Sequence, residues 1–286
     1  MKTAIVTDTN CGISQARSKE LGIFMLPMPV ILDGKEYFEG VDLTHGQFYD
    51  RLESGADAST SQPAPGDVLS TWESVLSQGY DEIVHIPMSS GLSASYQTAL
   101  GLADEFRGKV RVVDNHRVSV SQYDGVMDAI GLVAQGKSAV EVKESLERTG
   151  LESVIYLGVD TLKYFKKNGR CTAATAALGT VLNIKPLLKC DGARFDAVAK
   201  VRGAVNCRKK LLETAVAAAE VLRHGGSISI GVAGSFVDKA EEDAWYEEVK
   251  AAFPGDPTHF ESLSFSVICH TGPNAFGLGI SRRVAL

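Results

Sequence analysis

Short apolar runs alternate with amphipathic stretches along the first half of the chain. Each apolar run is closed by a polar or turn residue, which is typical of a buried strand; these runs are 3–7, 82–86 and 110–113. Between and after them, apolar residues recur at intervals of three and four and predict helices at 44–52, 67–76, 91–106 and 124–135. Strands and helices that alternate in this way form a parallel sheet covered by helices.

The second half repeats this alternation. The pattern predicts strands at 153–159, 184–188, 227–232 and 262–268, and helices at about 203–223 and 238–252. A helix that ends at Thr149 and Gly150 marks the best domain boundary, with one α/β domain at 1–150 and a second at 151–286. Because no Pro- or Ser-rich linker lies there, we expect two closely packed lobes of the α/β class.

The composition excludes some classes of function. The chain has 286 residues, enough for about two domains, and its 44% hydrophobic and 22% charged residues are typical of a globular protein. The net charge is −6, the pI is about 5.6, and no run of like charge occurs. Proteins that bind nucleic acid through counterion release carry a basic stripe, so we expect no nucleic-acid partner.

The apolar run at the N-terminus is too short for a signal peptide and soon meets Asp8. No stretch approaches the ~18 apolar residues of a membrane span, so we expect no transmembrane segment. The five cysteines are widely spaced and include no C-x-x-C pair. We therefore expect neither a disulfide framework nor a structural zinc site, and a cytoplasmic location.

One segment, Gly131 to Ser138, matches the phosphate-binding pattern G-x-x-x-x-G-K-S. A true phosphate-binding loop follows a strand and precedes a helix. Here the stretch before the loop is itself helical, Gly136 stands where a helix ends, and Ser138 with Glu141 forms a capping box for the next helix. We expect the end of one helix and the start of the next here, rather than a nucleotide site.

Two turns rich in hydroxyl groups lie at 59–63 and 89–93. The second lies between an expected strand and an expected helix, where open α/β sheets bind ligands and helix N-termini favour anions. Ser and Thr are also the commonest helix N-caps, so either turn alone has an ordinary structural explanation. Together the two turns favour a site for a carboxylate or a phosphate.

Arg170 and His270 are further candidates. Arg170 ends a basic turn at 166–170, and His270 is expected just after the strand 262–268. Arg presents a planar fork to an oxyanion, and His donates a hydrogen bond or titrates near neutral pH. An exposed basic turn and a loop histidine remain the alternatives.

Other chemistries find less support. Ser93 and His270 could serve nucleophilic catalysis, but no G-x-S-x-G turn surrounds Ser93. The sequence at 277–280 fails as a dinucleotide fingerprint because Arg282 stands where a third Gly is required. No H-E-x-x-H motif occurs, so we expect no metal or nucleotide cofactor.

An ordered set of short motifs is more specific than any one of them. The set consists of Asp8-Thr9, 60–63, 89–93 with Tyr96 and Gln97, Val113-Asp114, 168–170, 182–186 from Leu182 to Pro186, and 270–273. In this order, across almost the whole chain, it resembles the DegV family of bacterial fatty-acid-binding proteins. The chain departs from the usual family pattern at Thr9, Ala94, Ser95, Asn115 and Asn168, where small or polar character is retained.

The resemblance implies a two-lobed α/β protein that binds a long-chain fatty acid, with no further cofactor. It also implies a carrier that presents the acid to a separate ATP-dependent kinase subunit, which phosphorylates it for phospholipid synthesis. Carried over to this sequence, Thr60 or Ser61, together with Ser93 and Ser90, would hold the carboxylate. Arg170 and His270 would lie near the mouth, and Arg170 and Arg202 would dock the kinase.

A fatty acid would also need an apolar tunnel, for which 173–178 and Leu187-Leu188 are candidates. We expect burial of the tail to dominate affinity and the hydroxyl groups to fix orientation. Two other functions remain open. The chain could be an acyl or phosphoryl transferase that uses Ser93 or His270 covalently, or a protein that regulates a partner in response to fatty acid.

Overall fold

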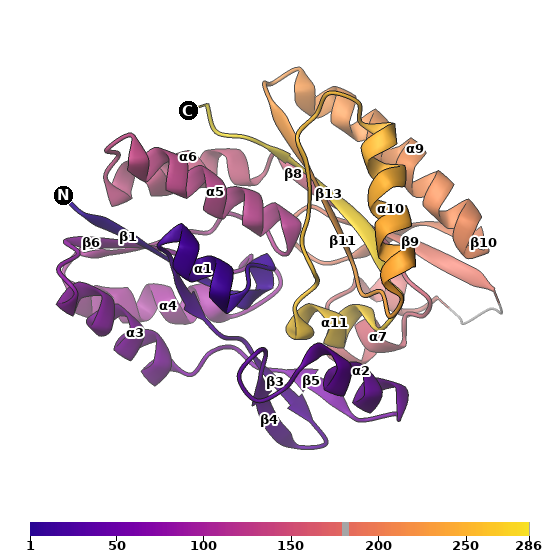
Figure 1. Cartoon of the computed structure of the whole chain (residues 1–286), viewed down its shortest axis with the longest axis horizontal. Coiled ribbons are helices and arrows are strands. Elements are labelled where there is room, and N and C mark those ends of the chain that lie inside the picture. The colour runs from indigo at the N-terminus through magenta and orange to yellow at the C-terminus, as the bar shows by residue number, and fades with distance from the viewer. Residues whose placement is uncertain (179–182, 286) are drawn as a thin grey trace.

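The three strands expected in the first half belong to one parallel sheet (Figure 1). The computed structural model describes residues 1–178 and 183–285. The sheet has the order β2-β1-β6-β7 and consists of β1 (Thr3–Asp8), β2 (Phe24–Leu26), β6 (Glu82–Ile86) and β7 (Val110–Val112). Its central strands β1 and β6 are buried along their whole length because both faces of the sheet are covered.

Helices cover both faces of this sheet. On one face, α5 (Val120–Ala134) and α6 (Ala139–Gly150) pack against β1 and β6. On the other face lie α3 (Pro65–Ser77) and α4 (Ser95–Ala103), which continues into the 3-10 turn η2 (Asp104–Phe106). Helix α4 starts four residues later than the sequence predicted, because the amides of Leu92 and Ser93 both bond to the Ser89 carbonyl in a turn.

Two helices begin at the capping boxes expected from the sequence. Thr44 caps α2 (His45–Glu53), and Ser138 caps α6. Before Ser138, α5 ends and Gly136 has a φ of +81°, a left-handed conformation that glycine adopts readily. The segment that resembles a phosphate-binding loop is therefore the end of one helix and the start of the next.

A small antiparallel sheet that the sequence did not predict follows β2. Its order is β4-β3-β5, formed by β3 (Pro29–Leu32), β4 (Lys35–Phe38) and β5 (Ala58–Thr60). Helix α2 packs against it through Phe48 and Leu52. The sheet places Thr60 at the end of β5.

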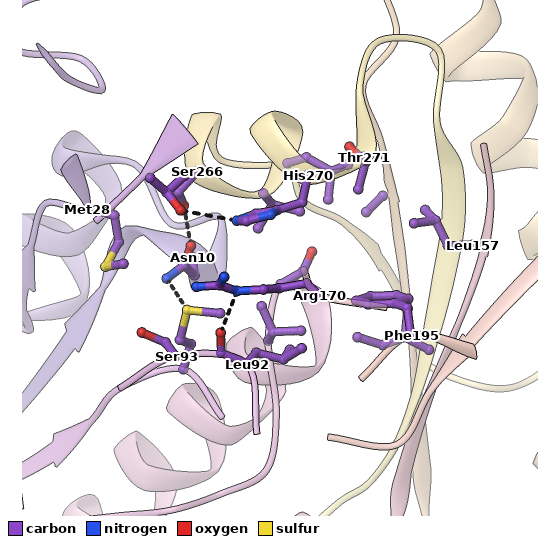
Figure 2. A pocket seen from close by; sticks show the side chains of 18 of the residues that line it. Asn10, Met28, Leu92, Ser93, Leu157, Arg170, Phe195, Ser266, His270 and Thr271 are labelled. Carbon is purple, nitrogen blue, oxygen red and sulfur yellow. Dashed lines mark hydrogen bonds between the residues drawn. The ribbon is translucent and has the colours of Figure 1, made fainter. Parts of the chain in front are cut away.

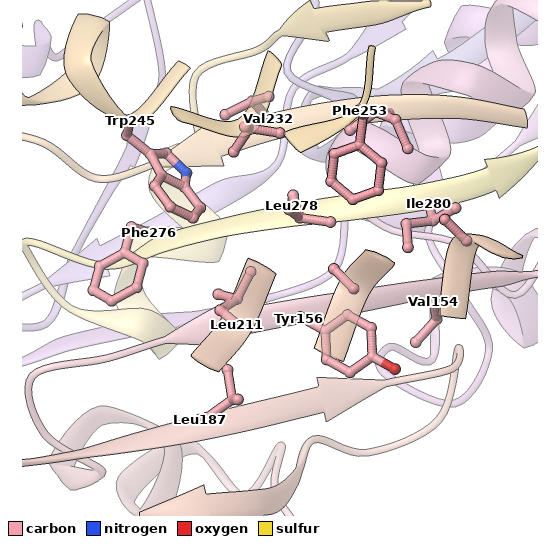
Figure 3. Packing of buried hydrophobic residues seen from close by; sticks show 14 of the residues in the cluster. Val154, Tyr156, Leu187, Leu211, Val232, Trp245, Phe253, Phe276, Leu278 and Ile280 are labelled. Atoms are coloured by element: carbon pink, nitrogen blue, oxygen red, sulfur yellow. The ribbon is translucent and has the colours of Figure 1, made fainter. Parts of the chain in front are cut away.

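The second half forms a six-stranded mixed sheet with the order β10-β9-β8-β13-β11-β12. The strands are β8 (Ser153–Gly158), β9 (Ile184–Cys190), β10 (Asp196–Arg202), β11 (Ile228–Gly234), β12 (Thr258–Phe260) and β13 (Phe276–Arg282). Three of them were predicted, and β10, β12 and β13 were not. The expected helices α9 (Ala204–Arg223) and α10 (Lys239–Ala252) cover one face around Trp245 and Leu211 (Figure 3).

The strand predicted at 262–268 is wrong. The segment forms helix α11 (Phe265–Thr271), which begins after Ser264, whose hydroxyl accepts a hydrogen bond of 3.4 Å from the Val267 amide. A short apolar run fits a buried helix as well as a strand, because every side of a buried helix is apolar. Helix α11 packs against β3, β5 and α7 (Lys163–Asn168).

The remaining helices are short: η1 (Thr9–Cys11), α1 (Gln15–Leu21) and α8 (Ala173–Ala176). Leu182, part of one motif that suggested the family, lies outside the described residues. Helix α5 contacts β1 of the parallel sheet and also β8, β11 and β13 of the six-stranded sheet. Helix α5 therefore packs against both sheets. Its N-terminal end reaches a cavity between them.

Candidate functional site

A cavity of about 320 Å3 lies between the two sheets, where the segments that follow β1, β5 and β6 meet α11 and β8. The carboxyl ends of parallel strands β1 and β6 point toward it, as expected for a ligand site in an α/β sheet. Its volume falls in the range of about 300–1,000 Å3 that is usual for small-molecule sites. Asn10, Ser93 and Ser266 gather on one side of it together with Met28 and Leu92, whereas Leu157 and Phe195 lie on the other side (Figure 2).

Most of the residues predicted from the sequence meet at this cavity. Thr60, Ser61, Ser93, Arg170 and His270 all line it, although they lie far apart in the chain. Thr60 Oγ1 and His270 Nε2 are 3.2 Å apart and share a hydrogen bond whose direction depends on the imidazole tautomer. The two hydroxyl-rich turns thus face one ligand space.

Two predicted residues lie elsewhere. Ser90 does not line the cavity, and its amide donates a hydrogen bond of 3.2 Å to Asp114 Oδ1. Arg202 ends β10, an edge strand of the six-stranded sheet, where its side chain is exposed. Arg202 is thus separate from the cavity and free to contact another molecule.

The Arg170 guanidinium is held by two backbone carbonyls. Its Nε donates to the Leu92 carbonyl at 3.1 Å, and its Nη1 donates to the Asn168 carbonyl at 2.6 Å. Within residues 1–178 and 183–285, Arg170 forms no ion pair with a carboxylate. A partly buried cation therefore faces the cavity with its charge uncompensated by a protein acid, a setting that favours an anionic ligand.

His270 lies in the last turn of α11, not after a strand as the sequence suggested. Burial, and then the neighbouring Arg170 charge, lower the pKa of His270 from 6.5 to about 4. The imidazole is therefore neutral near pH 7 and donates one hydrogen bond. Its Nδ1 is buried and has no hydrogen-bond partner among the described residues.

The sequence reasoning missed three polar residues of the cavity, Asn10, Ser119 and Ser266. Asn10 Oδ1 accepts hydrogen bonds from the hydroxyls of Ser266 and Ser264, which fixes the amide, and Asn10 Nδ2 donates to Met88 Sδ at 3.0 Å. Asn10 follows the first strand directly, so its position was a usable signal. Ser266 gave no such signal because its segment was assigned to a strand.

The apolar wall comes from different residues than expected. Leu157, Ile155 and Phe195 contribute to it, and Figure 2 shows Leu157 and Phe195 on the side away from Asn10 and Ser93. None of the residues proposed at 173–178 lines the cavity. Leu187 packs under α9, and Leu188 belongs to the cluster around Phe165.

The arrangement of Ser93 does not match that of an activated nucleophile. Ser93 Oγ is 2.8 Å from Ser95 Oγ and accepts a hydrogen bond of 3.2 Å from the Ser95 amide. His270 bonds to Thr60 instead of Ser93. A nucleophile normally lies within hydrogen-bond reach of its base.

The described residues contain no group of three or more His, Cys, Asp or Glu side chains arranged to hold a metal ion. In the same residues, no helix is both long enough and apolar enough to cross a bilayer.

Comparisons with known proteins agree with the fold. The DegV family model, described as "Uncharacterised protein, DegV family", matches residues 2–283. A DegV domain-containing protein of Deinococcus radiodurans is 33% identical over 283 residues, 98% of each chain. A Thermus thermophilus structure, described as fatty acid binding of a DegV family protein, has a TM-score of 0.87 at 30% identity and covers 98% of this chain and 99% of that one. A Bacillus subtilis structure, described as DegV, a fatty acid binding protein, has a TM-score of 0.85 at 24% identity over 99% of this chain and all of that one. This last similarity supports the fold alone.

Proposed function

This chain belongs to the DegV family, and on that premise we propose that its cavity binds a long-chain fatty acid. The observation that carries the proposal is the division of the cavity into a polar end around Arg170 and His270 and an apolar wall that includes Leu157 and Phe195. A fatty acid has the same division. The fatty acid binding described for the Thermus relative supports this assignment.

The carboxylate would lie among Thr60, Ser61, Ser93 and His270, near the Arg170 cation. The Ser93 hydroxyl supplies one hydrogen-bond donor, and the bonded pair of Thr60 and neutral His270 supplies a second, because one of the pair's two protons is used in the bond between them. Each such bond to a charged group contributes about 1.5–3 kcal/mol. Arg170 adds a favourable charge in a partly buried setting, where screening by water is weak. These groups orient the head of the ligand.

The tail would lie along the apolar wall. Each buried methylene contributes about 0.8 kcal/mol, so a long chain gains about 10 kcal/mol before the costs of association. This exceeds the contribution of any single polar contact at the head. In this arrangement the hydroxyl-rich loops of residues 1–150 hold the carboxylate together with Arg170 and His270, and strands of residues 151–286 supply much of the surface for the tail.

The carrier role is a further part of this proposal. We propose that a separate ATP-dependent kinase subunit binds at the exposed Arg202 and at Arg170. A carboxylate oxygen of the bound acid would then bond to the γ-phosphorus of ATP while ADP leaves, and the acyl phosphate would enter phospholipid synthesis. Because ATP is the phosphoryl donor, this reaction would take place in the cytoplasm.

Native mass spectrometry of the purified protein tests the ligand. We expect near-stoichiometric fatty acid on the wild-type protein, and acid that is at least tenfold more weakly held by the double variant Thr60→Ala/Ser93→Ala, because each lost bond costs about 1.5–3 kcal/mol. Ser70→Ala, which removes an exposed hydroxyl on α3, is the matched control. A double variant that retains the acid like the wild type would refute the site, and a protein that binds no fatty acid would refute the function.

A second experiment tests presentation to a kinase. With a kinase subunit and ATP, Arg202→Ala should lose acyl phosphate formation while it still binds fatty acid, and Lys209→Ala on the neighbouring helix should not. Equal activity of Arg202→Ala and the wild type would refute the docking site. A covalent acyl adduct on Ser93 in denaturing mass spectrometry would instead establish a transferase.

A further inference from the structure

The two faces of the six-stranded sheet differ in side-chain size. Large residues of β11 and β13 point toward α9 and α10, among them Val232, Phe276 and Leu278 (Figure 3). The residues that alternate with them point to the opposite face, because successive side chains of a strand lie on opposite sides. On that opposite face the central positions are Gly231, Ala233, Gly277 and Gly279.

These four small residues form a continuous trough. Gly231 is the register partner of Gly279, and Ala233 is the register partner of Gly277, so the two pairs are adjacent rows across β11 and β13. Ala233 and Gly277 line the cavity. This row of the trough therefore borders the ligand space, with the Leu157 side chain beside Gly277; it is called the open row below.

Val120 covers most of the other row, with His259 Cε1 beside Gly231 and Ile155 Cγ1 beside Gly279. A Cβ added to Gly231 or to Gly279 would lie only 2.9 Å from Val120 Cγ2, which shows that the valine rests directly on both backbones. Val120 is 1% exposed and also lines the cavity. It therefore stands at the boundary between the open row and the row that it covers.

The backbone brings Val120 to this place through a sharp turn. Ser119, which precedes it, has a φ of 55° and a ψ of −136°, a conformation that residues other than glycine rarely adopt. Val118, Ser119 and Val120 all line the cavity, and Val120 then begins α5. The turn thus directs this side chain into the trough.

We infer that Val120 sets the length of the acyl chain that the cavity accepts, by occupying the part of the glycine trough into which a longer tail would extend. This inference rests on the proposed binding of fatty acid. The isopropyl side chain of valine has two carbons more than the methyl side chain of alanine. Val120→Ala therefore frees space for about two further carbons of a ligand. The cavity wall there is the backbone of Gly231 and Gly279, flanked by the side chains of His259 and Ile155.

Equilibrium binding of straight-chain saturated acids that differ by two carbons tests the inference, with displacement of a fluorescent fatty acid as the readout. Burial of one methylene changes affinity about fourfold, so Val120→Ala should shift the preference toward an acid two carbons longer by about 15-fold. Ala233→Val adds bulk to the open row and should shift the preference toward shorter acids. Val126→Ala is the matched control, since Val126 is buried on the same helix but does not line the cavity.

The outcomes separate this inference from the function on which it rests. If the wild-type protein binds fatty acids but Val120→Ala and Ala233→Val keep the wild-type profile of chain lengths, Val120 does not set the length. An equal shift in Val126→Ala would also overturn the inference, because it would trace the effect to lost stability. Failure of the wild-type protein to bind any acid of the series would overturn the proposed function itself.

Discussion

Mild acid should destabilise the ligand-free protein through His270. Burial and the Arg170 charge lower the pKa of this imidazole from 6.5 to about 4, so the folded protein resists a proton that the unfolded chain accepts. The contribution to stability is complete above pH 6.5 and is lost as the pH falls from 6.5 toward 4. Full protonation corresponds to about 3 kcal/mol, and at pH 5 the loss is about 2 kcal/mol.

Urea unfolding at pH 7 and at pH 5 measures this loss. The variant His270→Gln cannot titrate, so its free energy of unfolding should fall by about 2 kcal/mol less than that of the wild type over the same interval. The variant must be compared with the wild type because burial also lowers the pKa of His85, to about 3. Protonation of His85 therefore lowers the stability of both proteins in acid. The matched control is His45→Gln, which removes a half-exposed imidazole.

A bound fatty acid should reverse part of this effect. A carboxylate beside His270 favours the charged imidazole and raises its pKa, so binding near pH 5.5 should take up a proton, detectable by calorimetry in buffers of different ionisation enthalpy. Parallel pH profiles for the wild type and His270→Gln would refute the reasoning. So would an NMR titration that gives His270 a pKa near 6.5 in the free protein.

Three further substitutions test the structure. Ser119→Gly should raise the free energy of unfolding by about 1 kcal/mol, because glycine adopts the backbone angles of this position without strain; a loss of stability in urea would contradict this. Trp245→Ala should lower the free energy of unfolding by about 3–5 kcal/mol, because the indole is fully buried and donates a hydrogen bond of 3.1 Å to the Gly277 carbonyl. Trp245→Phe should lower it less. Lys137→Ala should change the free energy of unfolding by less than about 0.5 kcal/mol, because the ion pair of Lys137 with Glu141 is exposed. Nucleotide binding that depends on Lys137 would contradict the assignment of this segment to the end of α5 and the start of α6.

Periodicity predicted the first sheet well because its strands are buried on both faces. Strands such as β1 and β6 are buried along their whole length and contain short apolar runs, and the helices between them carry clear apolar faces. The strands of the second sheet were harder to predict from the sequence. In β10, alternate residues are exposed, and Lys200 and Arg202 interrupt its hydrophobic pattern.

Strand β13 shows a different limit. Gly277 and Gly279 broke its apolar run, so no strand was predicted there, although both glycines are required by the close approach of other groups. An added Cβ at Gly277 would lie 2.7 Å from the Tyr156 carbonyl. Such a requirement depends on neighbouring strands that are distant in the sequence, and local patterns do not contain it.

The site was predictable where polar residues follow strands. Ser93 was found in this way, and the same rule applied to Asn10 would have added it. Thr60 was selected from its hydroxyl-rich turn and the family resemblance, because β5 was not predicted. Ser266 could not be found, because the error in its secondary structure placed it on a strand. The partners of His270 also depend on tertiary packing, since Thr60 is 210 residues away in the chain.

The role inferred for Val120 requires that α5 hold one position against the six-stranded sheet. Buried charges supply this constraint. Nη2 of Arg117, just before the helix, donates to the carbonyls of Thr149 and Arg282 at 2.9 Å each, and Asp128 in the helix accepts a bond of 2.7 Å from Arg283 Nε. Buried ion pairs add little net stability because their desolvation cost offsets their attraction, but they strongly disfavour arrangements that leave a charge unpaired. The network therefore fixes the helix in register with the sheet, and a side chain at its first residue keeps the constant position that a limit on ligand length demands.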